Sequence, residues 1–549
     1  MLKDGPLNTL LIRLGILVLR LIAPSSIIYT LFRLSHLLNF ASYDTYKNNN
    51  TFGPPYVLLP DIYLALEAAF YLLFALPRSY ILNRAAPAPS PLKTAQERRE
   101  VLERTWDATP EPRRYLEGYF CGLSVKVLRS EDVRDWLRWR LWGVFSKRKE
   151  AGHGDDGGDD GGGDVVVDED EVNDYLSYTE EVLGHRFREG RSGRSFMAVT
   201  HEPVVFVHRP LLWYVLFIGS ADTLACVMLW MYGFRFYRPS RWTFFKSFPL
   251  RPVVLLSSNS APSETFTYWM LPHTSKDPKH QPVMFVHGVG VGLHFYLPFL
   301  RALLPHCRAH GIGIICLEVN QVCSRITNAL PAPLQIVAEI NQILEYHGWQ
   351  HRRPVLLTHS YGSVIASHLL YDIGSREKFG PLIFADPVCF SFHPPDVAFN
   401  FLRRKPKSAS EWQLWYFASM DPDVGRCMTR RFRWQESSLW RQGVEGRGKK
   451  YREAGRVTVL LSGKDIITDV ETTGAYLTRS RGKDGGSDGK WYRQSMAERM
   501  DGKWKERKWT GKEGLEVVYL PGLNHAEIFE EERERALLVE IVKTYSLPA

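Results

Sequence analysis

Short apolar runs alternate with helical patterns through the second half of this chain, from about residue 252 onward. Runs of this kind, bounded by turn residues and separated by helices, are typical of a mostly parallel sheet that helices cover on both faces. In PLQIVAEINQILEYHG, for example, Ile336, Ile340 and Ile343 recur at helical spacing. The sequence therefore predicts an α/β fold, with strands at TFTYWML, PVMFVHG, GIGIICLEV, PVLLTHS, PLIFADPV, VTVLLSG and EVVYLPG.

One of these strands runs directly into a loop of spaced glycines, PVMFVHGVGVG, at residues 282–292. Such a loop occurs in dinucleotide-binding domains and also in hydrolases that stabilise an oxyanion. The dinucleotide fingerprint requires the spacing G-x-G-x-x-G and an acidic residue at the end of the next strand. Glu318 meets the second requirement, but Gly288, Gly290 and Gly292 are spaced G-x-G-x-G. Because the third glycine of the fingerprint is missing, the spacing disfavours a dinucleotide site.

A second junction, PVLLTHSYGSVIASHLL, places Ser360 between an apolar strand and a helix. This arrangement is typical of a nucleophile elbow, in which a strained turn exposes the serine hydroxyl and small residues are needed nearby. Gly362 and Ser363 meet that need after the serine, whereas Thr358 stands where a glycine is usual. We therefore predict Ser360 as a catalytic nucleophile on a turn that is tighter than usual.

A serine nucleophile needs a base and a group that orients the base, and α/β-hydrolases supply them in the order serine, acid, histidine. His525 follows the last predicted strand, in LPGLNHAEIF, and is the predicted base. Asp465 follows the strand before it, in VTVLLSGKDIITD, and is the predicted acid. Asp386, in FADPVCF, is the main alternative acid, and Asp469 is a weaker one.

With Ser360 as the nucleophile, the glycine loop is predicted to help stabilise an oxyanion. The tetrahedral intermediate of acyl transfer carries an oxyanion that two backbone N–H groups stabilise. Tyr361, directly after the nucleophile, is predicted to supply one N–H group and Val289 the other. Glycines in this loop let the backbone approach the substrate closely. His287 is expected to hold the loop by hydrogen bonds, because no residues at metal-ligand spacing accompany it.

At these positions the chain resembles a known family. The segments VHGVGVG, THSYGS, SGKD and LNHAE resemble those of serine hydrolases of the α/β-hydrolase fold. The wider pattern, with apolar N-terminal segments and HGVGVGLHFYLPFL…LEVNQVCSRI, is similar to membrane-associated fungal α/β-hydrolases. The motif match covers about residues 252–549. The resemblance implies hydrolysis of an ester or related bond without a cofactor, and it leaves the substrate open.

Two insertions are predicted within an α/β-hydrolase domain at residues 246–549. Residues 391–455 lie between two strands where such folds carry a lid, and they are expected to be helical. Their aromatic residues favour an apolar wall over the site, and the alternative is a helical cap without substrate contact. These aromatic residues are Trp412, Trp415, Tyr416 and Phe417. Residues 478–514 are basic, glycine-rich and aperiodic, which predicts a disordered surface insertion.

The first 245 residues contain three long apolar stretches, at residues 10–34, 58–77 and 211–234. The third has the length and composition of a transmembrane helix. In the first, Arg13 and Arg20 share one helical face, which favours an interfacial helix or arginines that snorkel. The basic segment after the third stretch places the catalytic domain on the cytosolic side. Because its other flank is also basic, at least one stretch is expected to be interfacial or re-entrant, within a membrane-associated region.

Composition argues against several other classes. A net charge of +9 suits an anionic membrane surface at least as well as nucleic acid, and no zinc-finger or RNP-like motif is present. The seven cysteines are scattered and never spaced CxxC, which disfavours a disulfide framework or a zinc site. The acidic tract at about residues 150–174 lacks the ligand register of a calcium loop, so a solvated, disordered loop is predicted.

Together these features predict a membrane-associated serine hydrolase that cleaves an apolar carboxylic ester, with lipids among the candidate substrates. The same residues would serve an acyltransferase that passes the acyl group to an alcohol other than water. A third alternative is a non-catalytic α/β-hydrolase scaffold in a membrane, because a fold does not by itself fix a function. Thr358 and the long insertion before His525 keep this alternative open.

Overall fold

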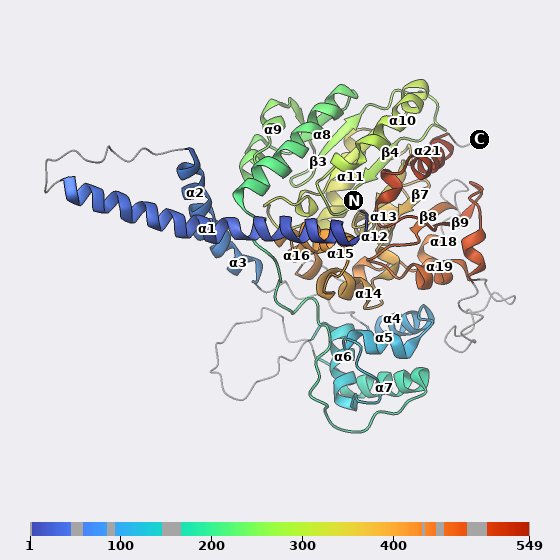
Figure 1. Ribbon diagram of the computed structural model, residues 1–549. Coiled ribbons are helices and arrows are strands. Elements are labelled where there is room, and N and C mark those ends of the chain that lie inside the picture. Colours follow the sequence, from blue (N-terminus) through green and yellow to red (C-terminus); the bar gives the residue numbers. More distant parts are fainter. Residues whose placement is uncertain are drawn as a thin grey trace.

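The computed structural model describes residues 3–44, 59–84, 94–144, 166–430, 434–445, 455–479 and 502–547. Its centre is a nine-stranded sheet with the order β2-β1-β3-β5-β4-β6-β7-β8-β9 (Figure 1). The six strands from β5 to β9 along this order are parallel, and β3 is antiparallel to both β1 and β5. The strand bounds are β1 (Arg235–Arg238), β2 (Asn259–Ser260), β3 (Thr267–Leu271), β4 (Val283–Val286), β5 (Ile314–Glu318), β6 (Val355–His359), β7 (Leu382–Ala385), β8 (Arg456–Ser462) and β9 (Gly514–Leu520).

The central strands are buried on both faces. On β4, Met284 and Val286 pack into the core on one face, and Val283 and Phe285 pack into the core on the other. Burial on both faces is what a parallel strand beneath two layers of helices requires. The first face is covered by α11 (Pro333–Tyr346), α12 (Gly362–Tyr371) and α19 (Val470–Thr478), and the second by α8 (Gly219–Met231), α10 (Leu297–His310) and α21 (Glu532–Ser546). The predicted fold class, a mostly parallel sheet flanked by helices as in α/β-hydrolases, is confirmed.

The sheet begins earlier in the chain than the sequence suggested. All seven predicted strands are present, but β1 lies before the expected domain boundary at residue 246. Strands β1 and β2 have only four and two residues, and their sequences RFYR and NS carry little apolar signal. A short polar edge strand is stabilised by pairing with its neighbour, which a local pattern does not reveal.

Both segments predicted to be disordered are partly ordered where the structure describes them. Helix α7 (Glu169–Leu183) begins inside the acidic tract, because the Asp168 side chain caps it by accepting hydrogen bonds from two backbone N–H groups. In the basic insertion, Trp504 is buried, and β9 begins at its end. The remaining parts of these two predictions, at residues 150–165 and 480–501, lie outside the described residues.

Among the residues that the structure describes, three helices formed by the apolar stretches are long and apolar enough to cross a membrane: Pro6–His36, Leu59–Leu82 and Trp213–Met231. Only 17%, 11% and 22% of their most apolar windows is buried within the protein, so most of this apolar surface is exposed. The first lies in α1 (Pro6–Asp44), which crosses the molecule and projects beyond it beside α2 (Figure 1). The second comprises α2 (Leu59–Ala69), η1 (Phe70–Ala75) and α3 (Leu76–Leu82), and the third comprises η2 (Trp213–Ile218) and α8.

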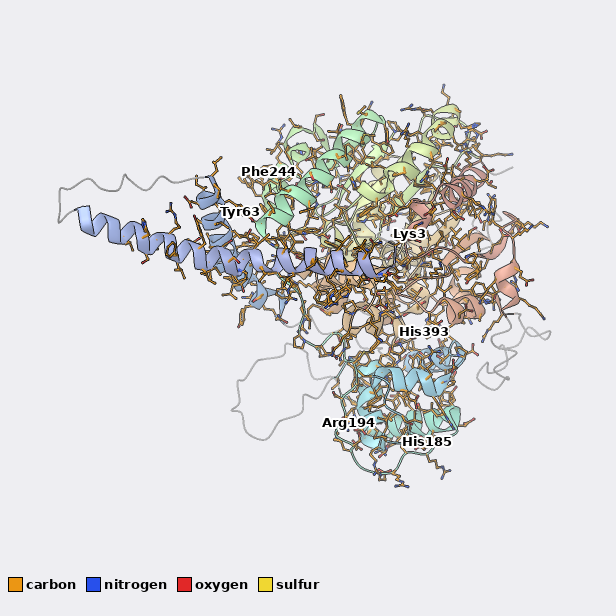
Figure 2. The ribbon with its side chains drawn as sticks, viewed as in Figure 1. Lys3, Tyr63, His185, Arg194, Phe244 and His393 are labelled. Atoms are coloured by element: carbon orange, nitrogen blue, oxygen red, sulfur yellow. The ribbon has the colours of Figure 1, made fainter. Side chains whose placement is uncertain are left out.

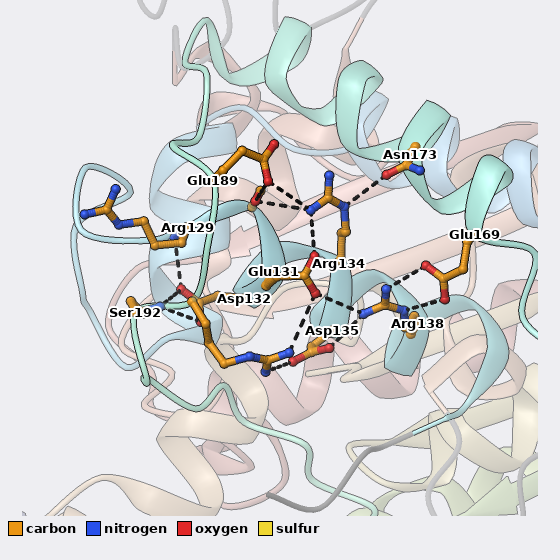
Figure 3. Close-up of polar contacts among 12 residues, drawn as sticks. Arg129, Glu131, Asp132, Arg134, Asp135, Arg138, Glu169, Asn173, Glu189 and Ser192 are labelled. Atoms are coloured by element: carbon orange, nitrogen blue, oxygen red, sulfur yellow. Dashed lines mark hydrogen bonds and ion pairs between the residues drawn. The ribbon is translucent and has the colours of Figure 1, made fainter.

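Four helices form a separate lobe below the sheet in Figure 1. They are α4 (Ala95–Asp107), α5 (Pro112–Tyr119), α6 (Ser130–Trp142) and α7. In Figure 3, Arg138 of α6 pairs with Glu169 of α7 at 2.6 Å, and within α6 Arg134 pairs with Glu131 at 2.7 Å. These pairs are partly exposed, so each contributes at most about 1 kcal/mol to stability.

The lobe is attached to the domain that contains the sheet at His393, which Figure 2 labels where the two meet. The carbonyl oxygen of His393 accepts hydrogen bonds from Tyr115 Oη at 2.6 Å, Tyr119 Oη at 2.9 Å and Arg140 Nη2 at 3.2 Å. All four residues are buried, so breaking this contact would leave polar groups without partners. The lobe therefore packs on the start of the lid.

The predicted lid is helical in the parts that the structure describes, residues 391–430 and 434–445. Its elements are η6 (Cys389–Ser391), α14 (Asp396–Ala398), η7 (Phe399–Arg403), α15 (Ala409–Leu414), η8 (Trp415–Ser419), α16 (Pro422–Thr429), α17 (Trp434–Ser437) and α18 (Arg441–Glu445). Asn400 Nδ2 donates to the carbonyl oxygen of Ile467 at 3.0 Å, two residues after Asp465. The lid is thus joined to the edge of the sheet where the predicted site residues lie.

Candidate active site

Ser360 occupies a sharp turn between β6 and α12. Its φ is +48°, a left-handed conformation that costs a residue with a side chain about 1–3 kcal/mol. The turn is possible because Gly362 lies against β4: a Cβ at Gly362 would be 2.3 Å from the carbonyl oxygen of Val286. Thr358, the departure from the usual pattern, is fully buried within β6 and causes no break in the strand. The local structure is the predicted nucleophile elbow.

Three side chains that are far apart in the sequence meet at the carboxyl edge of the sheet. His525 Nε2 lies 2.8 Å from Ser360 Oγ, and His525 Nδ1 lies 2.8 Å from Asp465 Oδ2. Ser360 follows β6, Asp465 follows β8 and His525 follows β9, so parallel strands deliver all three to one edge. The structure therefore brings together the predicted nucleophile, base and acid.

The carboxylate of Asp465 is held as an acceptor. Its Oδ1 accepts hydrogen bonds from the backbone N–H groups of Ile467 at 2.7 Å and Thr468 at 3.3 Å, and its Oδ2 accepts from Thr468 Oγ1 at 3.0 Å. Burial alone would raise the pKa of Asp465, but the charge and hydrogen bond of His525 and these donors lower it below its ordinary value. An ionised Asp465 fixes the proton of neutral His525 on Nδ1, which leaves Nε2 free to accept a proton.

The same pairing alters the imidazole. Burial alone would lower the pKa of His525, but the Asp465 carboxylate, its hydrogen bond and the nearby Asp386 raise the pKa above its ordinary value. A higher pKa makes the imidazole a stronger base toward the Ser360 hydroxyl. It also means that more of the protein carries a protonated His525 at slightly acidic pH.

Asp386, the alternative acid, has a different set of partners. Its Oδ1 accepts from the Ser462 N–H at 2.9 Å and its Oδ2 from the Ala526 N–H at 2.9 Å. Burial, together with the Asp465 carboxylate, raises the pKa of Asp386 to about 6. Asp386 therefore braces the backbone directly after His525, while the imidazole hydrogen bond goes to Asp465. Asp469, the third candidate, caps α19 through Thr472.

The glycine loop lies directly against the nucleophile. A Cβ at Gly288 would be 2.8 Å from Ser360 Cβ, so only glycine permits this approach. In the part of the chain that the structure describes, the N–H groups of Val289 and Tyr361 donate to no protein acceptor. Two free N–H groups beside a serine hydroxyl are what an oxyanion site requires. Their predicted role is therefore compatible with the local geometry.

His287 holds the loop, as predicted, because its Nε2 accepts from the Val319 N–H at 3.1 Å and its Nδ1 donates to the Gly288 carbonyl at 2.7 Å. Tyr296 was not predicted as a site residue. Its hydroxyl accepts from the Gly288 N–H at 3.0 Å and also lies 2.8 Å from Nδ1 of His359, next to the nucleophile. Tyr296 thus links the glycine loop to the elbow. Its position eight residues after Gly288 carries no recognisable motif.

Some of the aromatic residues predicted as an apolar wall contact the N-terminal 245 residues. Phe417 stacks on Trp213 of η2 with 5.2 Å between ring centroids. The Arg13 guanidinium of α1 lies over the Trp412 ring at 5.5 Å from its centroid. The charge of Arg13 thus lies against the lid, and its position relative to a membrane stays a prediction.

No protein-family model matches the sequence, and no curated protein matches it. Similar solved structures include a bacterial membrane phospholipase A (12% identity, 62% of this chain and 94% of that chain, TM-score 0.36). They also include a thermophilic esterase from Thermogutta terrifontis (12% identity, 51% of this chain and 94% of that chain, TM-score 0.33). A third is the monoacylglycerol lipase of Paleococcus ferrophilus (15% identity, 51% of this chain and 99% of that chain, TM-score 0.29). At these scores the similarity carries no information about reaction or substrate. The resemblance to membrane-associated fungal α/β-hydrolases stays a prediction.

Proposed function

We propose that this chain is a membrane-associated serine hydrolase that cleaves an apolar carboxylic ester. The observation that carries the proposal is the pair of 2.8 Å contacts that link Ser360 Oγ, His525 and Asp465. A hydroxyl bonded to an imidazole that a buried carboxylate orients is the arrangement that turns serine into a nucleophile. The three largely exposed apolar helices support a membrane location and, with it, an apolar substrate.

In the proposed reaction, His525 Nε2 removes the proton from Ser360 Oγ as this oxygen attacks the ester carbonyl carbon. The oxyanion that forms accepts hydrogen bonds from the N–H groups of Val289 and Tyr361. The protonated imidazole then gives its proton to the leaving alcohol oxygen, which leaves an acyl-Ser360 ester. Water attacks this ester with His525 again acting as the base, and the carboxylic acid is released.

A second candidate function is acyl transfer to an alcohol. Ser360 and His525 are only 6% and 8% exposed, so little bulk water reaches the acyl group in this conformation. An alcohol bound at that point would compete well with water for the acyl-enzyme. Product analysis with an added long-chain alcohol separates the two functions: transfer gives a new ester as the main product, and hydrolysis gives the free acid.

A fluorophosphonate probe tests the proposal, because it reacts with an activated serine hydroxyl. We expect the full-length protein to be labelled and labelling to disappear in Ser360→Ala. The control is Ser124→Ala, an exposed serine in the helical lobe, which should be labelled like the wild type. A folded wild type that takes up no probe would contradict the proposal and favour the non-catalytic scaffold.

A further inference from the structure

The third apolar helix, Trp213–Met231, carries a buried network of ion pairs at its midpoint. Asp222 lies halfway along this helix. Its carboxylate accepts from Arg251 Nε at 3.0 Å and pairs with Arg325 Nη2 at 2.5 Å, and Arg251 Nη1 also donates to Glu318 at 2.8 Å. Arg251 and Arg325 are only 2% and 4% exposed. The midpoint of the helix is therefore joined to the domain that contains the sheet.

A helix that crossed the bilayer could not keep this network at low cost. Its midpoint would lie near the bilayer centre, where a single charged side chain costs about 2.5–3.5 kcal/mol. Glu318 ends β5, so the edge of the sheet and its loops would have to enter the hydrocarbon with Asp222. Irregular loops that face lipid do not occur there. If the helix left the domain instead, Arg325 would lose its carboxylate, and breaking a buried pair costs about 3–5 kcal/mol.

Both flanks of this helix belong to the same folded domain. Before the helix, the Val207 N–H donates to the Met420 carbonyl of the lid at 3.0 Å. After the helix, β1 joins the sheet, with Tyr237 opposite Tyr268 of β3. The two flanks of a helix that crosses a bilayer lie on opposite sides of it, and these contacts hold them on one side. The same arrangement accounts for a basic sequence on both flanks.

The two faces of the helix have different surroundings. One face is buried at helical spacing, and its Ala225 and Leu229 pack in the core beneath the sheet. The other face is apolar as well, but each of its large side chains is 47–73% exposed. These side chains are Leu216, Phe217, Leu224, Val227, Trp230 and Met231. A contiguous exposed apolar surface of this kind marks a site of contact with a membrane or a partner.

The exposed surface continues from α8 onto the segments that follow it. A groove of about 630 Å³ separates α8 from α9 (Pro252–Leu256), and Trp230 and Leu256 both line it (Figure 1). Leu256 is 83% exposed. Next to α9 lies η3 (Arg241–Lys246), in which Trp242 and Phe245 are 73% and 69% exposed. The outer face of α8, η3 and α9 thus form one apolar surface, which we call the leaflet face.

The charges around the leaflet face are all positive in sequence. Residues 223–263 contain five lysines and arginines and no aspartate or glutamate. Arg235, Arg241 and Lys246 are exposed there. Exposed tryptophan and phenylalanine beside basic side chains are typical of protein surfaces that lie in the interface of a membrane, where the bases meet lipid phosphates. The charge and the apolar side chains therefore favour a lipid leaflet as the occupant of this face.

We propose that Trp213–Met231 does not cross the membrane but lies along it, with the leaflet face inserted into one leaflet. Asp222 keeps the helix on the α/β domain, the outer face of α8 contacts lipid chains, and Arg235, Arg241 and Lys246 contact lipid phosphates. The α/β domain and the helical lobe then lie on the same side of the bilayer. The inference does not depend on the hydrolase activity, because it rests on contacts that do not involve Ser360.

The depth of nitroxide labels in the full-length protein tests the inference, in vesicles of phosphatidylcholine and phosphatidylglycerol. The labels are placed on Phe217→Cys, Leu224→Cys and Met231→Cys, three exposed positions spaced by seven residues, in a Cys121→Ser background that removes the exposed cysteine. Depth follows from the collision rates with oxygen and with a water-soluble nickel chelate. The unlabelled-position background gives the residual signal, and Ser177→Cys, exposed in α7 of the lobe, is the control in water.

We expect the three labels to lie in one leaflet at depths within about one helical turn, 5 Å, of one another. A helix that crosses the bilayer would place residue 224 about 10 Å deeper than the other two, since each residue rises 1.5 Å, and this result would overturn the inference. Labels as open to the nickel chelate as the label on Ser177→Cys would also overturn it, because the face would then not be in lipid.

Two further variants keep the test decisive if those on the helix do not fold. A label on Leu256→Cys of α9 should also lie in the leaflet, and equal access of the nickel chelate to this label and to Ser177→Cys would contradict the proposal. In sealed membranes from cells that express the protein, a maleimide that does not cross membranes should treat Ser177→Cys and the exposed Lys276→Cys alike. These positions precede and follow the helix, so labelling of only one of them would show that the helix crosses the membrane.

Discussion

Replacing Asp465 by asparagine should abolish most of the activity while leaving the fold intact. Oδ1 of Asp465 accepts two backbone N–H groups, from Ile467 and Thr468, so the amide oxygen of the asparagine must take this position. The amide NH₂ group then faces His525 Nδ1 and donates to it. Neutral His525 is thereby forced to carry its proton on Nε2, toward Ser360, and cannot act as the base.

The size of the expected loss in kcat/KM follows from the two orientations that the asparagine amide can adopt. Turning the amide over would restore the correct tautomer but would leave two buried N–H groups without an acceptor, at about 1–3 kcal/mol each. The negative charge that stabilises protonated His525 is lost in either case. We therefore expect kcat/KM to fall by about 10³–10⁴-fold, equivalent to about 4–5.5 kcal/mol, a range that includes the effect of the same change in serine proteases.

The assay is kcat/KM for a chromogenic ester together with the rate of fluorophosphonate labelling, in variants whose unfolding temperature is also measured. The matched control is Asp386→Asn, because Asp386 is equally buried but bonds only to the N–H groups of Ser462 and Ala526. This control should lose about 1–3 kcal/mol of stability, since one buried N–H loses its acceptor, and less than about tenfold in kcat/KM. A larger loss of activity in Asp386→Asn than in Asp465→Asn would refute the reasoning and make Asp386 the acid.

Three further outcomes are expected. Gly362→Ala should destabilise the protein by about 1–3 kcal/mol in urea unfolding, because its Cβ would lie 2.3 Å from the Val286 carbonyl oxygen; a change below about 0.5 kcal/mol would contradict the packing of the elbow. Only neutral His525 accepts a proton, so kcat/KM should rise with pH, and because its pKa is raised the midpoint should lie above the ordinary value of 6.5; a midpoint at or below that value would speak against the pairing with the carboxylate. Tyr296→Phe should lower kcat/KM by about tenfold, about 1.4 kcal/mol, because the Gly288 N–H loses its acceptor; unchanged kinetics would show that this bond does not position the loop.

The positions of the three candidate residues at one edge of the sheet could be predicted because their sequence signals are local. Each central strand is buried on both faces and reads as an apolar run, and Ser360, Asp465 and His525 each directly follow one. Parallel pairing then brings these strand ends together, so placement at a strand end predicts that Ser360 and His525 lie close to each other. The choice between Asp465 and Asp386 could not be made locally, because both follow a buried strand and only the path of the His525 loop separates them.

Other features depend on contacts between distant segments and were not predictable. Trp412 and Phe417 carry an apolar signal that fits a substrate wall as well as it fits a packing surface, and their contacts with Arg13 and Trp213 involve segments far away in the sequence. In the sequence, Tyr296 is an ordinary aromatic residue at the start of a helix. Its role in linking the glycine loop to the elbow follows from the position of its hydroxyl.

The central claim is that the hydroxyl of Ser360 forms the covalent bond to the acyl group. The most direct measurement is acid quenching of the full-length protein during turnover of an ester, followed by peptide mapping of the trapped adduct by tandem mass spectrometry. We predict the mass of the acyl group on the peptide that contains Ser360, and its absence in His525→Ala. An acyl group on a different residue of the active wild type, or turnover that persists in Ser360→Ala, would contradict the account.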